Sequence, residues 1–281
     1  MPDETRPPAG WAAIGLRMLA VCGYGLWMLL GLGLALGIYS EGRGESLVPL
    51  LVGASFVSLG PLLASAGVPW LRGWRGWRLE PGLRPSRQAL LALACYLPML
   101  GVAGLARGSN DFWATRLVSA ALAACSLACL VYVPRGARAR RPPGLVAQLP
   151  VDRVITACYG GGLWLLLCVV SQDPAVRAGD TRMWVIGLLL LALLLGLVEG
   201  MRWQSATGPG RGAGGRWRRR FAAAALTYAV PCLGLLLVHY EYDDRWPVLL
   251  AALACVVGRS IELHLYEGMP GCGGEAASSP G

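Results

Sequence analysis

The chain alternates long apolar stretches with short polar segments, and this pattern predicts its secondary structure. Eight stretches are mainly apolar, whereas a helix needs only about 20 such residues to cross a bilayer. We therefore expect an all-α, polytopic integral membrane protein with about eight transmembrane helices. The predicted spans are Trp11–Tyr39, Leu47–Val68, Ala89–Leu105, Leu117–Val133, Val154–Val170, Met183–Val198, Phe221–Tyr240 and Trp246–Leu265.

The third, fifth and sixth spans are short for a bilayer, so their helices should continue into flanking residues. The eighth is interrupted by Arg259 and Glu262. The polar segments are too short to form hydrophobic cores of their own. We expect residues 1–267 to form a single transmembrane helical domain, with a flexible linker at Gly208–Gly215 and a disordered tail at 268–281. Beyond the succession of hairpins, no internal repeat is apparent.

The arginines gather on one side of the predicted bundle. The segments after the second, fourth and sixth spans hold 16 Arg, whereas the four segments on the other side hold six Arg and eight acidic residues. Positive residues are retained on the cytoplasmic side of a membrane. This pattern predicts four hairpins in a bacterial inner (cell) membrane, with both termini cytoplasmic.

The composition agrees with a membrane protein, because 55% of residues are hydrophobic and only 15% are charged. A net charge of +9 could suggest nucleic acid. The arginines lie beside apolar spans, however, which fits membrane topology better. Asp3 and Glu4 do not form the basic region of a secretory signal, so the first span is expected to be retained.

The cysteines and histidines do not predict a metal or haem site. Eight of the nine Cys lie in apolar spans and none forms a CxxC pair. Cys125 and Cys129 share a helix face, but two soft ligands do not define a metal site. His239 and His264 lie near opposite ends of the membrane, so they cannot act as paired haem ligands.

Other motifs give weak signals. The chain has no P-loop, GxSxG or HExxH sequence. Gly33 and Gly37 form a GxxxG, which predicts close approach of a second helix. His239 and the acidic residues after it lack metal-ligand spacing, so we interpret them as a solvated outer loop.

Trp and Arg alternate after the second span, in the stretch PWLRGWRGWR. If this segment is helical, spacings of four and three place the Trp rings on one face. Indole rings prefer the headgroup level and Arg can reach phosphates, so the segment is interpreted as an interfacial anchor. The alternative is a docking edge for a partner subunit or a quinone headgroup. The residues are Trp70, Arg72, Trp74, Arg75, Trp77 and Arg78.

Polar residues gather again near the end of the last span, in GRSIELHLYEG. Arg259 and Glu262 are three residues apart and can pair on one helix face. Ionisable groups at membrane depth are functional candidates, and a carboxylate beside His264 could relay protons. The alternative is that the pair lies in water at the cytoplasmic end of the helix. Glu199, at the inner end of the sixth span, is ambiguous in the same way.

Two stretches resemble the membrane anchor subunit of dimethyl sulfoxide reductase-type molybdoenzymes. The first is SAGVPWLRGWRGWR followed by Pro85–Ser86–Arg87, and the second is Gly258–Arg259 with Tyr266. Members of that family have eight spans and no haem. Where the family has a histidine of its quinol site, this chain has Ser65 or a neighbour, and Gly67–Val68–Pro69 replaces a Gly-Arg-Pro turn.

The resemblance implies an anchor that holds a molybdopterin catalytic subunit and an iron–sulfur subunit at the membrane. Such a chain would bind menaquinol, oxidise it and pass electrons to the iron–sulfur subunit, without a metal or haem of its own. Arg259 carries over weakly and, with Glu262 and His264, forms the candidate quinol site. The alternatives are a small-solute transporter or permease, for which Pro98 and Pro231 could break helices, and a non-catalytic scaffold.

Overall fold

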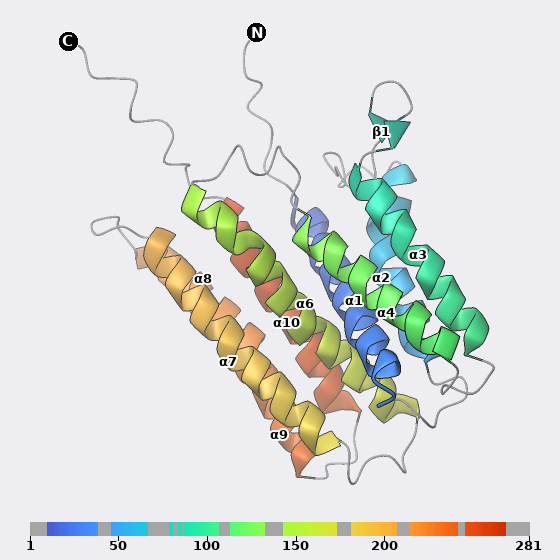
Figure 1. Cartoon of the computed structure of the whole chain (residues 1–281). Helices are drawn as coiled ribbons and strands as arrows, with labels where there is room; N and C mark the ends of the chain where they lie inside the picture. Colours follow the sequence, from blue (N-terminus) through green and yellow to red (C-terminus); the bar gives the residue numbers. More distant parts are fainter. Residues whose placement is uncertain are drawn as a thin grey trace.

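A computed structural model describes residues 10–38, 46–66, 79–80, 84–85, 87–106, 113–132, 143–172, 181–206, 214–240 and 245–267. Within these ranges the chain forms a bundle of long helices (Figure 1). The helices are α1 (Trp11–Ala35), α2 (Leu47–Ser65), α3 (Arg87–Leu105), α4 (Trp113–Val131), α6 (Pro143–Gln172), α7 (Thr181–Ala206), α8 (Gly214–Ala224), α9 (Val230–His239) and α10 (Trp246–Glu267).

Two short features complete the described structure. The π-helical turn η3 (Ala225–Ala229) joins α8 to α9, so the three form one span. Strands β1 (Leu79–Glu80) and β2 (Arg84–Pro85) have two residues each and pair antiparallel between α2 and α3.

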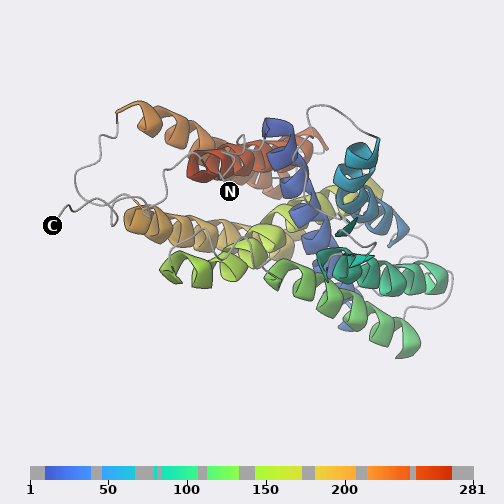
Figure 2. The ribbon, with the colours of Figure 1, turned by 90° about the horizontal axis from the view of Figure 1, so that it is seen from above.

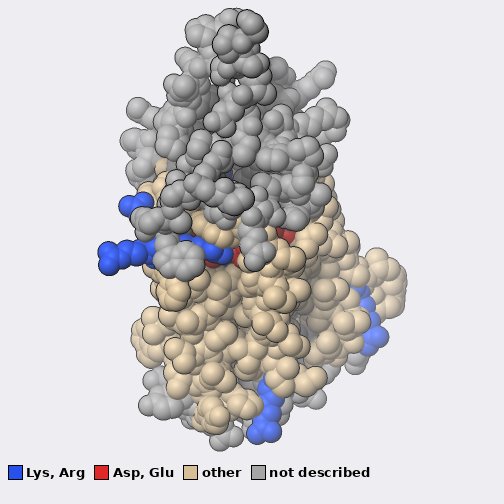
Figure 3. All heavy atoms as spheres, turned by 90° about the vertical axis from the view of Figure 1, so that its left-hand side faces the viewer, with Lys and Arg blue, Asp and Glu red and all other residues tan. Residues whose placement is uncertain are grey.

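The outward faces of the helices are apolar, as expected of a protein surrounded by lipid. Seven of the described helical spans are long and apolar enough to cross a membrane, and Ala89–Leu105 of α3 is a shorter apolar helix. Figure 3 shows a broad uncharged band on one face, with the visible Arg side chains around its borders. The chain is therefore an all-α, multi-pass membrane protein. Its exposed leucines include Leu93, Leu97 and Leu100 on α3 and Leu190, Leu193 and Leu197 on α7.

All eight predicted spans form helices, but the first ends earlier than predicted. Gly37 has a φ of 74°, which favours glycine and closes α1. The Ile38 N–H donates to the Gly33 carbonyl at 2.9 Å, and the Gly37 N–H donates to Leu34 at 3.2 Å. Gly37 therefore lies beyond the helix that it terminates, and the GxxxG spans the end of α1.

The short spans extend into flanking residues, as predicted. α6 has 30 residues and α7 has 26, several more than their apolar stretches. α10 continues without interruption through its charged residues. α8 begins at Gly214, inside the predicted linker Gly208–Gly215. The rest of that linker, the predicted tail at 268–281 and the Trp–Arg segment from Trp70 to Arg78 lie outside the described residues.

The bundle has two halves, each with its own hydrophobic core. In the first, α1 to α4 pack around Trp27 and Leu122, and in the second, α6, α7, α9 and α10 pack around Tyr159 and Leu195. α1 and α6, the first helices of the two halves, make the most extensive helix–helix contact in the protein. Figure 2 shows α1 crossing the molecule between α2, α3 and α4 on one side and α7 to α10 on the other.

Glycines allow α1 and α6 to cross with their backbones almost touching. A Cβ atom on Gly25 would lie 1.8 Å from the Ala157 carbonyl oxygen, and one on Gly161 would lie 2.3 Å from the Leu26 nitrogen. Small residues that permit such approach are typical of helix contacts in membranes. The contact between the two halves therefore depends on Gly25 and Gly161 rather than on the predicted GxxxG.

Matching sequence patterns occur in the two halves. Arg17-x4-Cys22 in α1 has a counterpart in α6, Arg153-x4-Cys158. Gly-Leu-Trp follows after two further residues in α1 and after three in α6. α3 contains Tyr-x-Pro-x-Leu-Gly from Tyr96, and the seventh span contains Tyr-x-x-Pro-x-Leu-Gly from Tyr228. The extra residue falls at the edge of η3, and a π turn accommodates one additional residue in a helix. Short sequence patterns therefore recur in helices at corresponding places of the two halves.

Candidate functional site

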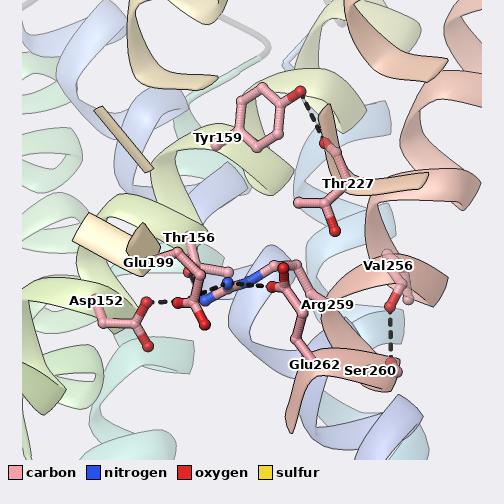
Figure 4. A network of polar contacts seen from close by, with 9 residues as sticks. All are labelled: Asp152, Thr156, Tyr159, Glu199, Thr227, Val256, Arg259, Ser260 and Glu262. Atoms are coloured by element: carbon pink, nitrogen blue, oxygen red, sulfur yellow. Dashed lines mark hydrogen bonds and ion pairs between the residues drawn. The ribbon is translucent and has the colours of Figure 1, made fainter. Parts of the chain in front are cut away.

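Arg259 is buried at the centre of a polar network between α6, α7 and α10 (Figure 4). Its Nη1 donates to Glu262 Oε2 at 2.5 Å and to Glu199 Oε2 at 3.2 Å. Its Nη2 donates to Asp152 Oδ1 at 2.8 Å and to Thr156 Oγ1 at 2.9 Å. We call Asp152, Glu199, Arg259 and Glu262 the charged cluster.

All four members of the charged cluster are shielded from solvent. Arg259 is 3% exposed and each of the three acids is 6% exposed or less. Removing an ion from water costs several kcal/mol, and close ion pairs with good hydrogen bonds offset that cost. Within the described set, three carboxylates share one guanidinium.

The charged cluster lies just inside one end of the apolar spans. Asp152 lies two residues after the start of the apolar segment of α6. Glu199 lies two residues before the end of the apolar segment of α7. Arg259 lies six residues before the end of the apolar segment of α10. At 1.5 Å per residue, the members lie about 3–9 Å inside the edge. Because Arg259 and Glu262 are buried, the alternative that they lie in water is wrong.

Unpartnered polar groups surround the cluster on its inner side. Among the described residues, Thr227 Oγ1, Tyr228 OH and Arg259 Nε are buried with no hydrogen-bond partner. Thr227 lies against α10, since a Cβ on Gly258 would be 2.4 Å from its Oγ1, and the Tyr228 ring lies against Gly196 of α7. Thr227 and Tyr228 belong to η3, and π turns are frequent at functional sites.

A second tyrosine reaches the same turn from α6. The Tyr159 hydroxyl donates to the Thr227 carbonyl at 3.2 Å (Figure 4). Tyr159 is fully buried in the core of the second half. This bond joins η3 to α6, the helix that also carries Asp152. Both Thr227 and Arg259 are therefore hydrogen-bonded to α6.

The structure brings together two of the three residues predicted to bind quinol. Arg259 and Glu262 form the predicted pair across one helical turn. The His264 ring instead packs against Trp11 of α1, with centroids 4.0 Å apart. Residues Trp70 to Arg78 lie outside the described residues. Their role as a lipid or partner interface stays a prediction.

Asp152 and Thr156 were missed by sequence reasoning. The predicted fifth span began at Val154, which placed Asp152 in the preceding loop. α6 begins 11 residues earlier, at Pro143, so Asp152 enters the bundle. Tyr228 and Thr227 gave no signal because single hydroxyl residues are common in membrane helices. The position of the acids along the spans was a usable signal. Asp152 and Glu199 both lie at the ends of their spans that adjoin the Arg-rich segments.

Two cysteines of the first half lie close together. Cys129 does not pair with Cys125 on its own helix; its sulfur lies 3.4 Å from that of Cys95 on α3. In the part of the chain that the structure describes, no three His, Cys, Asp or Glu side chains are grouped so that they could hold a metal ion.

A hollow lies at the opposite end of α7 from Glu199. It has a volume of about 530 Å³ and is bordered only by apolar residues. Such a hollow suits a hydrocarbon chain but offers no polar group that could orient a headgroup. It is therefore separate from the charged cluster. Its lining includes Leu29, Ile38, Met183, Trp184, Leu188 and Leu194.

Comparisons with known proteins found no relative of this chain. No protein-family model, curated protein or solved structure matches the chain. The charged cluster and the arrangement of the helices around it therefore carry the functional inference.

Proposed function

We propose that this chain is the membrane anchor subunit of a dimethyl sulfoxide reductase-type molybdopterin oxidoreductase. It holds the catalytic and iron–sulfur subunits at a bacterial inner membrane, oxidises menaquinol and passes the electrons to the iron–sulfur subunit. The eight-helix layout and the sequence stretches that resemble that family support this function. The observation that carries it is the buried charged cluster, which contains the carried-over Arg259.

The chemistry of quinol oxidation matches the groups in the cluster. Each quinol releases two electrons and two protons, and the protons need acceptors near the ring hydroxyls. Glu262 and Asp152 supply carboxylate acceptors, and Arg259 can stabilise negative charge on a quinol oxygen as its proton leaves. The electrons pass to the iron–sulfur subunit, and the terminal substrate is reduced on another chain.

The orientation follows from the arginine distribution. The end of the bundle with the charged cluster is the end with the Arg-rich segments, which we propose to be cytoplasmic together with both termini. At that end, Arg218 and Arg219 are exposed on α8, and the Arg220 guanidinium lies 4.0 Å from the centre of the Trp203 ring. Such Arg–Trp pairs suit the headgroup level of a membrane.

The described helices support a transporter less well than an anchor subunit. Transporters bind solutes at helices that unwind near the middle of the membrane. Here α3 continues through Pro98, and the seventh span continues through Pro231 with only the π turn before it. The two predicted breaks therefore provide no unwound segment. A passive scaffold, in turn, would not need a buried cluster of four charges.

Co-purification separates these functions. We expect a molybdopterin protein and an iron–sulfur protein to be encoded beside the gene of this chain. The tagged chain is co-expressed with them and extracted in mild detergent. We expect an iron-containing complex that oxidises a menaquinol analogue, and loss of quinol oxidation in Glu262→Gln with the complex still assembled. A chain that purifies without iron–sulfur partners and drives solute uptake in proteoliposomes would instead identify a transporter.

A further inference from the structure

We propose that the apolar hollow between α1 and α7 binds an acyl chain of one anionic phospholipid, whose headgroup lies at Arg116 and Arg182. The volume of the hollow, about 530 Å³, is within the range of about 300–1,000 Å³ that is usual for ligand pockets. The site is separate from the charged cluster. Glu199 lies five residues beyond Leu194, the last lining residue of α7, and about 140° further around the helix axis.

The hollow lies where the two halves of the bundle meet. α1 and α7 each pack against α6 but are not in extensive contact with each other. At the bottom of the hollow, Leu29 of α1 and Leu188 of α7 both lie over Gly162 of α6. A Cβ atom on Gly162 would be 3.4 Å from a methyl carbon of Leu29 and 2.5 Å from one of Leu188. Gly162 therefore lets both leucines lie close to α6, and the space above them stays open.

The hollow opens sideways, toward the lipid. Leu188 at its bottom is buried, whereas the side chains at its mouth are exposed. The exposed lining residues are Ile38, Met183, Leu190 and Leu194. An empty hollow would forfeit the dispersion contacts of its lining, and water would find no hydrogen-bond partners there. A hydrocarbon chain, which the bilayer supplies directly, is therefore the occupant that fits.

The length of the hollow matches one leaflet of a bilayer. Its lining on α7 begins at Met183, one residue inside the span Arg182–Met201, and ends at Leu194. These two residues are 11 positions apart, which corresponds to about 17 Å along a helix. One leaflet supplies half of a hydrocarbon core that is about 30 Å thick. The hollow therefore suits the acyl chain of a lipid in the leaflet opposite the charged cluster.

Two arginines lie at the end of the hollow that is farther from the charged cluster, beyond its apolar lining. Arg182 is exposed in the first turn of α7, directly before Met183. Arg116 is exposed in the first turn of α4. Its guanidinium lies beside the turn that carries Ile38, since a Cβ atom on Gly37 would be 3.4 Å from Arg116 Nη2.

Guanidinium groups suit the phosphate of a phospholipid. Arginine binds phosphate through two parallel N–H donors, and its five donors allow this even while another group is bound. Each basic residue near a membrane surface also strengthens the attraction of anionic lipid. An anionic phospholipid therefore matches both the apolar lining and the two positive charges beside it.

Native mass spectrometry of the purified full chain tests the proposal without quinol or partner subunits. The chain is extracted in detergent and titrated with phosphatidylglycerol or with phosphatidylcholine. We expect one phosphatidylglycerol to stay bound, at least about fivefold more tightly than phosphatidylcholine, which is the effect of one arginine near anionic lipid. The combined variant Arg116→Ala/Arg182→Ala should lose this preference. Arg218→Ala/Arg219→Ala, which removes two exposed arginines of α8, is the matched control and should keep it.

Gly187→Leu tests the hollow itself. Gly187 belongs to the lining and nothing lies within 4 Å of its Cβ position, so a leucine there enters open space. We expect this variant to lose the bound phospholipid. Gly200→Leu on the same helix is the matched control, because its Cβ position is equally open but lies outside the lining. It should keep the lipid.

Several results would overturn the assignment. In the unaltered chain these are no retained phospholipid, equal binding of the two phospholipids, or a retained isoprenoid quinone in place of the phospholipid. The unaltered chain decides these points even if a variant does not fold. Retention of the lipid in Gly187→Leu, or of the anionic preference in Arg116→Ala/Arg182→Ala, would also overturn it. Failure of quinol oxidation in a chain that retains the lipid would overturn the proposed function only.

Discussion

Arg259 can hold three helices because a guanidinium has five donors in one plane. Four of its contacts go to α6, α7 and its own helix, in two forks that a lysine ammonium could not reproduce. The side chain gives the charged cluster its only positive charge among the described members. Its removal would leave three carboxylates facing one another in a poorly screened interior.

Loss of Arg259 should therefore destabilise the protein strongly. We expect Arg259→Ala to lower the free energy of unfolding by about 3–5 kcal/mol, the usual cost of leaving buried charge uncompensated. Thermal unfolding in detergent measures the effect. Arg218→Ala removes an exposed arginine from α8 and serves as the control, with little change expected. Equal melting temperatures for the two variants would contradict the buried ion pairs.

Glu262, the ion-pair partner of Arg259, allows a second test. Arg259→Ala and Glu262→Ala should each impair quinol-linked activity while the assembled complex persists. The double substitution should be less than additive, with a coupling of about 0.5–3 kcal/mol, because the two side chains share one interaction. A double-mutant cycle on activity and stability measures it. Strictly additive losses would mean that the two residues act independently.

At the level of elements, the crossing of α1 and α6 determines how the halves meet. Their contact uses glycine because the backbones approach closely. Lipid surrounds the outer helices and gives no hydrophobic drive for association, so this packing contributes directly to stability. A single methyl group at the crossing would separate the two helices.

Gly25→Ala should thus destabilise the bundle. Its new methyl carbon would fall 1.8 Å from a backbone carbonyl, which cannot move aside as a side chain can. We expect a loss of about 1–3 kcal/mol, as for overpacked cores, measured by thermal unfolding in detergent. Gly15→Ala on the same helix is the matched control, because nothing lies within 4 Å of its methyl position. An equal response of both variants would place the crossing elsewhere.

For the whole molecule, the orientation in the membrane is the main testable property. We expect reporter fusions at Gly44 and Gly179 to behave as periplasmic and a fusion at Gly212 as cytoplasmic, because the Arg-rich segments stay inside. Paired phosphatase and fluorescent-protein reporters measure this. The opposite pattern would place the charged cluster at the periplasmic end.

The two halves of the molecule share short sequence patterns but differ in their polar residues. Two similar four-helix units meet across α1 and α6, yet the polar network lies in the second unit, with Ser126 and Cys129 at the matching places in the first. A protein made of two equal units would present one site in each. Among the described residues, the charged cluster therefore lies in the second half.

The sequence by itself determined the eight spans and their all-α nature, because a run of apolar side chains long enough to cross a bilayer must form a helix that satisfies its own backbone. It also predicted the Arg259–Glu262 pair, since residues three apart share a helix face. Only the tertiary structure brought Asp152 and Glu199 to that pair and moved His264 away to Trp11. Spacing along one helix is local, whereas contacts between helices depend on how they cross.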